Sequence, residues 1–272
     1  MQQNCDHSAQ EPLMEVKMSR RALIRGLAAG TVVPFAASGC ATNPETGRSQ
    51  FMLVSQGQLA KLSASAWSDV KEETPVSIDP VLNNQLRRVG GRIARGANRQ
   101  NENWEYAVFD TDEKNAFVMP GGKVGFYRGI MEFSENDDQI AAIMGHETGH
   151  VTARHAAERY SQKMAAGVGL QVANVALSQR DNRYKGEIAA ILGAGVQFGI
   201  ILPFSRKHEL EADKLGVDYM YRAGYDPRQA VRMWERMGEV SKSRQPEILS
   251  THPSPQTRVR ALDAYIRQRG YA

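Results

Sequence analysis

Hydrophobic residues recur at helical spacing in the first half of the chain. Apolar positions three and four residues apart run from Phe51 to Glu73, which predicts a helix there. A second helix is expected to begin at Asp79-Pro80, where an aspartate can cap the helix and a proline fits its first turn. The residues on its apolar face are Leu82, Leu86, Val89 and Ile93.

After residue 103 the pattern becomes that of strands. Trp104 to Phe109 is rich in aromatic and β-branched residues. Asn115 to Met119 and Lys123 to Tyr127 flank a Pro-Gly-Gly sequence, which predicts a hairpin. Only helices are expected beyond it. The predicted fold class is therefore α+β, with a small antiparallel sheet followed by a mostly helical second half.

Composition and charge indicate a globular domain and argue against a nucleic-acid-binding or disulfide-stabilised protein. The chain has 272 residues, 42% of them hydrophobic and 24% charged, which is enough material for a sizeable core. The formal net charge is +4, but Lys and Arg form no block interleaved with aromatic residues, so nucleic-acid binding is not expected. Because Cys5 and Cys40 are the only two cysteines, the body has no disulfide framework.

Residues 1–39 are predicted to be a signal peptide. Ser19-Arg20-Arg21 precedes a short apolar run, Ala22 to Ala37, and this order of basic and apolar regions directs export. The paired arginines resemble a twin-arginine signal. The run is too short and too rich in Gly and Ala for a comfortable membrane span. An uncleaved amphipathic helix is the alternative interpretation.

Cys40 follows Ala37-Ser38-Gly39, small residues that resemble a bacterial lipobox, although Ala37 stands where Leu or Val is usual. Cys40 would then be the lipid-modified first residue of the mature protein. Residues 40–50 are expected to form a lipidated tether, since Ala41 to Arg48 has no periodic pattern, and residues 51–272 the functional domain. Ala41, rather than Asp, after the cysteine resembles the default signal for outer-membrane sorting in a Gram-negative cell.

The main candidate chemistry lies in His146-Glu147-Thr148-Gly149-His150. Ser134 followed by Asp137 predicts a capping box that opens a helix through this motif. On that helix both histidines project from one face and can bind one zinc ion at about 2.0–2.1 Å. Glu147 can then act as a general base toward zinc-bound water. The alternative, core or solvated histidines with an incidental glutamate, is disfavoured because the preceding turns are apolar and buried imidazoles need partners.

A catalytic zinc ion normally takes three protein ligands and a water, so a third ligand must come from elsewhere in the chain. Residues 205–213 offer His208, Glu209, Glu211 and Asp213. Glu209 and Asp213 are four residues apart and share a helix face. That spacing suits one carboxylate that binds the metal and one that accepts a hydrogen bond from a histidine. A solvated acidic face would explain Glu211 but not the whole cluster.

Together these motifs resemble the zinc metallopeptidase family of the CAAX prenyl endopeptidase and HtpX. Within it, the layout is most similar to the soluble bacterial envelope lipoproteins of the BepA and LoiP type. The resemblance covers nearly all of the chain after Cys40 and implies a zincin-like (gluzincin) fold. Its further segments are Asn115-Ala116-Phe117, Pro120-Gly121-Gly122, Arg154-His155, Thr251-His252-Pro253 and Arg258.

The resemblance also implies a role for each site residue. Glu209 would be the third ligand of one zinc ion per chain, with Glu147 as general base and Asp213 as the partner of a ligating histidine. His252 and Arg258 would bind or stabilise the reacting carbonyl. The substrate would be aligned on an edge strand that carries Asn115, Ala116 and Phe117.

Two histidines keep alternative interpretations when the residues are considered alone. His252, before a proline, is equally a loop histidine or a group that takes zinc's open position. His155 is expected to be a buried, hydrogen-bonded helix residue and not a ligand. The apolar segment Ile188 to Phe204 is expected to be a core helix, or else a lid or membrane-facing hairpin over the cleft.

The expected function is hydrolysis of peptide bonds in unfolded or misassembled envelope proteins, in protein quality control. The enzyme would be anchored to the membrane through Cys40, on the periplasmic face of the outer membrane. The hydrolytic chemistry is inferred from the residues themselves, whereas the substrate class is inferred from the family resemblance. The alternative is a zinc-stabilised chaperone or assembly factor that binds extended clients; a purely structural lipoprotein would leave the histidines unexplained. No helical-repeat domain is expected after Arg258.

Overall fold

The structure is a computed structural model that describes residues 40–163, 165, 204–241, 246, 248–252 and 255–271, all of them within the unit formed by residues 39–272. The predicted signal peptide and most of the apolar segment from Ile188 lie outside these residues. None of the helices in the described part of the chain is long and apolar enough to cross a membrane.

The described chain begins with a hairpin where the sequence predicted an irregular tether. Strand β1 (Cys40–Thr42) pairs with β2 (Ser49–Phe51) in antiparallel register, with Cys40 opposite Phe51. The loop between them turns at Gly47, whose φ of +65° favours glycine. The hairpin is too short to produce a periodic pattern, and its polar residues pair with the body of the protein.

Both helices expected in the first half are present. Helix α2 (Gln56–Glu73) begins five residues after Phe51, because Ser55 forms a capping box with Gln58. Helix α3 (Pro80–Gly96) begins as predicted, with Asp79 accepting a hydrogen bond from the backbone amide of Val81.

The sheet is mixed, whereas the sequence predicted an antiparallel one. It contains β3 (Glu105–Phe109), β4 (Ala116–Met119) and β5 (Lys123–Tyr127) in the order β3-β5-β4. The β4–β5 hairpin is antiparallel as predicted, but β3 runs parallel to β5. The connection after β3 carries the chain past the place that β5 later fills. Strand patterns do not encode this order, so the antiparallel assignment was wrong for β3.

The motif helix does not begin with the predicted capping box. Helix α4 (Arg128–Phe133) ends at Ser134, whose hydroxyl donates to the carbonyl of Ile130. Helix α5 (Asp137–Thr152) is capped instead by Asn136, whose side chain accepts from the backbone amide of Gln139. The acidic Asp137 and Asp138 then lie in the first turn, where they suit the helix dipole.

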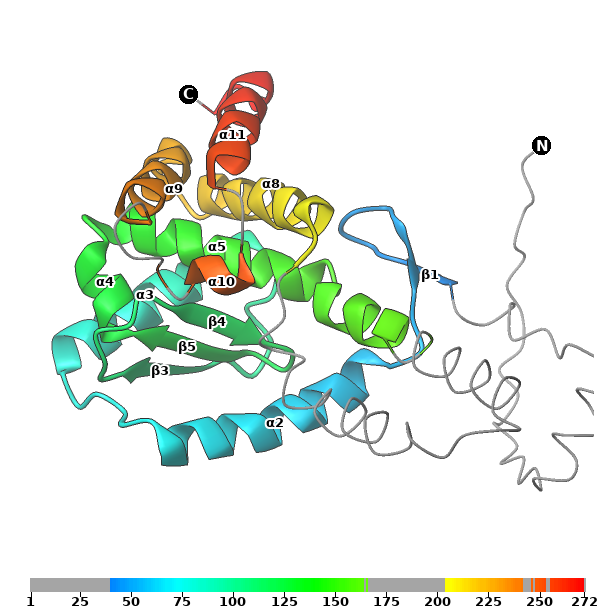
Figure 1. Cartoon of the computed structure of the whole chain (residues 1–272), viewed down its shortest axis with the longest axis horizontal. Coiled ribbons are helices and arrows are strands. Elements are labelled where there is room, and N and C mark those ends of the chain that lie inside the picture. The colour runs from blue at the N-terminus through cyan, green and yellow to red at the C-terminus, as the bar shows by residue number, and fades with distance from the viewer. Residues whose placement is uncertain are drawn as a thin grey trace, which may run out of the picture. The chain divides into compact units, whose positions relative to one another are not determined.

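Helices dominate the described second half, as predicted. These are α8 (Arg206–Arg222), α9 (Arg228–Val240), α10 (Ile248–Thr251) and α11 (Pro255–Arg269). The sheet lies between α2 on one side and α5 on the other, and α8 and α11 continue the layers beyond α5 (Figure 1). The main core fills the space around α5, with Phe126, Ile140 and Ile143 fully buried. A smaller cluster around Trp67 and Phe109 packs on the opposite face of the sheet.

Glycines allow α5 and α8 to cross at backbone contact. A Cβ atom on Gly145 would lie 2.9 Å from the carbonyl oxygen of Gly216, and one on Gly149 would lie 2.7 Å from that of Ala212. Larger residues would separate the two helices. This close crossing holds the beginning of α8 against the histidines of α5.

Candidate metal centre

The two motif histidines lie one turn apart on α5 and are buried. Their exposed fractions are 1% for His146 and 4% for His150. The Nε2 atoms of the two rings are 3.1 Å apart, so both imidazoles point to one place. This is the geometry expected of an i, i+4 pair on a helix.

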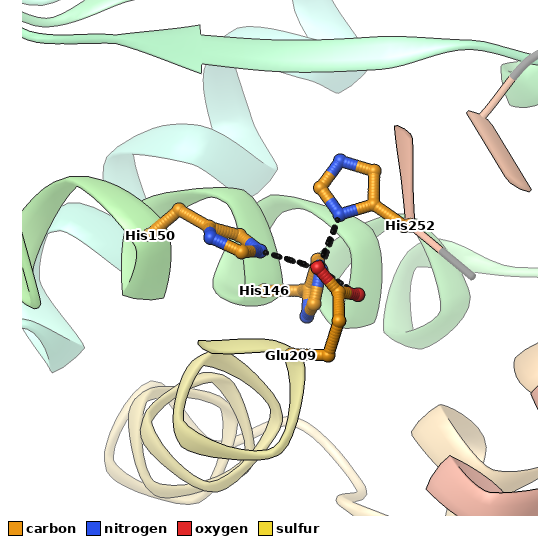
Figure 2. Close-up of side chains that lie close together, drawn as sticks. All are labelled: His146, His150, Glu209 and His252. Carbon is orange, nitrogen blue, oxygen red and sulfur yellow. Dashed lines mark hydrogen bonds and ion pairs between the residues drawn. The ribbon is translucent and has the colours of Figure 1, made fainter. Parts of the chain in front are cut away.

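Glu209 and His252 come from other elements to the same place. Glu209, in the first turn of α8, has one carboxylate oxygen 3.5 Å from His146 Nε2 and the other 3.4 Å from His150 Nε2. His252 follows α10, and its Nδ1 lies 3.1 Å from both His146 Nε2 and Glu209 Oε1. Figure 2 shows the four side chains converging. One ligand atom from each lies within 4.8 Å of the others.

The spacing of these atoms fits a tetrahedral metal ion. Ligands about 2.0–2.1 Å from zinc are about 3.3–3.4 Å from one another in a tetrahedron. Five distances among the four side chains, from 3.1 to 3.5 Å, are close to this edge length, with Glu209 using one oxygen toward His146 and the other toward His150 and His252. The full set of one ligand atom per residue spans up to 4.8 Å. Imidazole nitrogens with one carboxylate are also a donor set that zinc accepts. The cluster is therefore suited to hold one metal ion between His146, His150 and Glu209, with His252 directly beside them.

The electrostatics of the cluster favour the protonation states of metal ligands. Burial holds the pKa of His150 well below its usual value, so the ring is neutral. Burial opposes ionisation of Glu209, but the positive charges of His252 and Arg258 outweigh it and hold the pKa of Glu209 well below its usual value. A neutral imidazole and an ionised carboxylate are the forms that bind zinc.

Glu147 is placed to exchange a proton beside this cluster. Its side chain is 4% exposed, and Oε1 lies 3.4 Å from Nε2 of His252. Oε1 has no hydrogen-bond partner among the described residues. Burying a carboxylate oxygen without a hydrogen bond costs free energy of folding unless a ligand or a water molecule binds to it. This arrangement suits a general base that acts on a water molecule at the metal.

Asp213 and Arg258 support the ligands from the side away from the metal position. Asp213 Oδ1 lies 2.8 Å from Nδ1 of His146, the ring nitrogen that faces away from the cluster. Arg258 donates to both Asp213 oxygens, at 2.8 and 2.6 Å, and its Nη1 lies 3.0 Å from Glu209 Oε2. The guanidinium packs 3.5 Å from the ring centre of Trp234. Arg258 thus contacts both Glu209 and Asp213, the residue that pairs with His146.

The other candidates of α8 lie outside the cluster. Nε2 of His208 lies 3.4 Å from Glu158, and its ring stacks on His155. Glu211 forms ion pairs with Arg48 and His155. The i, i+4 spacing explains this outcome, because Glu209 and Asp213 share the helix face toward α5, whereas neither Glu211 nor His208 does.

The residues expected on an edge strand do lie at a sheet edge. Strand β4, which begins at Ala116, is an outer strand of the described sheet. Ala116 is buried in the main core, whereas Phe117 packs on the other face with Trp67 and Phe109. Asn115 precedes the strand and accepts a backbone hydrogen bond from Tyr127. The side chains of Ala116 and Phe117 therefore pack inside the protein, and a substrate would contact the main chain of β4.

Two residues beside the ligands were not predicted to have a role there. His155 Nδ1 lies 3.0 Å from Nδ1 of His150, because Arg154 adopts a left-handed φ of +57° that turns the chain back after α5. The ring centres of Phe204 and His150 are 3.9 Å apart. The guanidinium of Arg159 lies 4.0 Å from the ring centre of Phe204. The Arg154-His155 pair after the motif was the available signal for His155.

Comparison with known proteins identifies the family of this chain. The profile of Peptidase family M48 matches residues 80–266, more than half of the chain. The chain is 33% identical over 232 residues to the mitochondrial metalloendopeptidase OMA1 of Schizosaccharomyces pombe, an alignment that covers 82% of this chain and 65% of that protein. It is 30% identical over 245 residues to the β-barrel assembly-enhancing protease of Escherichia coli K12, covering 87% of this chain and 50% of that protein.

The chain thus spans between half and two thirds of the length of these relatives. The matched region contains the helix α5 motif, both carboxylates of α8, His252 and Arg258. The family resemblance inferred from the motifs is confirmed: the chain belongs to peptidase family M48.

Proposed function

We propose that this protein is a zinc-dependent endopeptidase. The observation that carries the proposal is the convergence of His146, His150 and Glu209 on one place, beside a buried Glu147 oxygen that has no hydrogen-bond partner among the described residues. These three residues would hold the ion. When bound, zinc supplies a lowered pKa for water and an electrophile that polarises a carbonyl.

Glu147 moves the proton in this reaction. Its carboxylate takes a proton from the attacking water as the oxygen bonds to the peptide carbonyl carbon. The same oxygen then delivers that proton to the amide nitrogen as the C–N bond breaks, so the products are a carboxylic acid and an amine. General acid–base groups of this kind contribute about 10²- to 10⁴-fold to rate.

Asp213 and Arg258 orient the ligands. Asp213 accepts the hydrogen bond of His146 Nδ1, which leaves Nε2 with a lone pair for the metal. Arg258 holds Asp213 and Glu209 together. A direct role of Arg258 toward the substrate carbonyl would require it to leave these contacts.

His252 has two roles, one when it lies at the site and one when it moves aside. Its Nδ1 lies beside the candidate ligand atoms, 3.1 Å from both His146 Nε2 and Glu209 Oε1. In this position it excludes water and substrate. Once it moves aside, it can donate a hydrogen bond to the oxyanion that forms on the carbonyl.

The substrates are unfolded or misassembled envelope proteins in protein quality control. An extended segment would add to strand β4 and gain main-chain hydrogen bonds, with little dependence on sequence. The relative in Escherichia coli is named for enhancing β-barrel assembly, which supports this substrate class.

The domain is anchored by lipid at Cys40 to the periplasmic face of the outer membrane. Cys40 is also the first residue of β1, so strand pairing begins at the lipidated residue without an intervening flexible linker. Metabolic labelling with a fatty acid would test the anchor, which a Cys40→Ala variant should lose.

The activity is tested with the purified chain at known zinc content, using labelled unfolded casein and a detergent-unfolded outer-membrane β-barrel protein. Wild type should cleave both. Glu147→Gln should keep its zinc and lose about 10²- to 10⁴-fold in kcat. Full activity of this variant with zinc bound would refute the assignment of the base.

The contact of His252 with His146 at the candidate site also favours a second candidate function, a zinc-stabilised chaperone or assembly factor that binds extended clients. Binding of the unfolded β-barrel protein without cleavage, by wild type at full zinc occupancy, would support this function over the first.

A further inference from the structure

The N-terminal hairpin (residues 40–51) docks on the end of α5 that carries His150. The side-chain amide of Asn43 donates to the carbonyl of Thr152 at 3.0 Å, and that of Gln50 donates to the carbonyl of Ala153 at 2.6 Å. Both side chains are fully buried, and they also bond to each other. The last carbonyls of a helix lack hydrogen-bond partners within the helix. The hairpin supplies hydrogen-bond donors to two carbonyls at this end of α5.

Arg48, on the same hairpin, reaches two carboxylates from different elements. It donates to the two oxygens of Glu158 at 2.7 and 2.6 Å and to Glu211 of α8 at 3.1 to 3.3 Å. Gln50 adds a hydrogen bond to Glu158 at 2.9 Å. A planar guanidinium that binds carboxylates in a fork fixes their orientation as well as their charge.

Glu211 continues this chain of contacts to the metal ligand. Its Oε2 lies 2.8 Å from Nε2 of His155, and Nδ1 of His155 lies 3.0 Å from Nδ1 of His150. His150 turns Nε2 toward the cluster. With a metal bound to that nitrogen, the proton of the ring would be on Nδ1, where it can be donated to His155 Nδ1. His155 then carries its own proton on Nε2 and donates it to Glu211. A single arrangement of protons satisfies the three groups and leaves the lone pair of His150 Nε2 for a metal.

From these contacts we infer that Arg48 is a positioning residue for His150, acting through Glu211 and His155. The inference rests on the proposed role of His150 as a ligand and extends it to a part of the chain that the motif does not include. The residues next to Cys40 thereby take part in building the metal site. Groups that hold the far nitrogen of a ligating histidine typically contribute 10- to 100-fold to metal affinity.

The test compares zinc affinity in the full chain, measured by competition with a chromophoric chelator. The variant Arg48→Gln should bind zinc more weakly, by up to about tenfold, since Arg48 acts on His150 through two intervening residues. Arg48→Lys, which keeps the charge but cannot fork between two carboxylates, should be intermediate. Arg88→Gln is the matched control, because Arg88 binds Asp137 at the opposite end of α5. It should bind zinc as tightly as wild type.

A spectroscopic measurement separates positioning from simple docking of the hairpin. Long-range ¹H–¹⁵N spectra of the six histidines report which ring nitrogen carries the proton. Zinc-loaded wild type should show His155 protonated only at Nε2, and Arg48→Gln should show a mixture of tautomers. Unchanged zinc affinity with an unchanged His155 spectrum in Arg48→Gln would overturn the inference. If that variant does not fold, the same comparison is made with Arg48→Lys and Glu211→Gln.

Failure of this inference and failure of the proposed function give different results. A wild type that binds zinc but cleaves neither substrate refutes the peptidase, while the affinity comparison still decides the role of Arg48. An active wild type, together with unchanged zinc affinity and an unchanged His155 spectrum in Arg48→Gln, refutes only the positioning role of Arg48.

Discussion

Helix α8 approaches α5 so closely at Gly149 that a Cβ atom on this residue would lie 2.7 Å from the carbonyl oxygen of Ala212 and 3.0 Å from its Cα. Both neighbours are backbone atoms, which cannot rotate away. The contact lies between His146 and His150 of one helix and Glu209 and Asp213 of the other. The small residue inside the motif therefore sets the distance across which a carboxylate reaches the histidines.

The first prediction follows from this contact. Gly149→Ala should destabilise the protein by about 1–3 kcal/mol, the usual cost of overpacking, and should weaken zinc binding because Glu209 moves away. Urea denaturation of zinc-free protein and chelator competition measure the two effects. Gly91→Ala on α3 is the control, since a Cβ there meets nothing within 4 Å. It should be neutral or stabilising by about 0.5–1 kcal/mol. Equal stability of both variants would contradict the prediction.

Metal removal gives a second prediction. Zinc binds only the folded site, so it should stabilise the protein by about 4 kcal/mol when free zinc is a thousandfold above Kd. Thermal unfolding at increasing zinc concentration measures this. Glu147→Gln should keep the full shift, because Glu147 is not a ligand, whereas His150→Ala should lose most of it. A zinc-dependent shift that survives in His150→Ala would place the ion elsewhere.

A third prediction concerns the buried pair of Arg258 and Asp213, whose exposed fractions are 1% and 3%. Arg258→Met leaves the Asp213 charge buried without its partner and should cost about 3–5 kcal/mol. Adding Asp213→Asn should recover part of this loss. The matched control is Arg267→Met on the same helix, where the pair with Asp263 is exposed; no measurable change is expected. Denaturant unfolding of wild type, Arg258→Met, Asp213→Asn, the double variant and the Arg267→Met control measures the differences, and additive losses of the two single variants would argue against the pairing.

A fourth prediction concerns acid stability. Hydrogen bonds from Lys71 and Lys123 lower the pKa of Glu105 to about 2. The contact between Lys71 of α2 and Glu105 of β3 joins the helix to the sheet. The folded pKa lies below the unfolded value of about 4.3, so the stabilisation is fully present above the unfolded value. It is lost as the pH falls from there through the folded value of about 2.

Comparing wild type with Glu105→Gln across this range tests that prediction. The wild type should be the more stable protein near neutral pH, and the difference in unfolding midpoint should shrink between about pH 4.5 and pH 2. Solvent screening reduces the size of the effect, because the carboxylate is 42% exposed. A pH-independent difference would show that packing, not charge, stabilises this contact.

The sequence alone determined the features that depend on local spacing. The i, i+4 histidines of the motif, the start of α3 at Asp79-Pro80 and the β4–β5 hairpin around Gly121 and Gly122 each follow from a few neighbouring residues. The shared face of Glu209 and Asp213 follows in the same way, since helical periodicity alone brings them together.

Tertiary structure decided what depends on distant segments meeting. The parallel pairing of β3 with β5 depends on the path of a loop, and the cap at Asn136 depends on where α4 ends. The hairpin at residues 40–51 is stabilised by Thr152, Ala153, Glu158 and Glu211, contacts that no periodicity within it could predict. The place of His252 beside His146 and Glu209, and of His155 behind His150, likewise required the folded chain. A pattern specifies which face a side chain occupies but not which atoms it meets there.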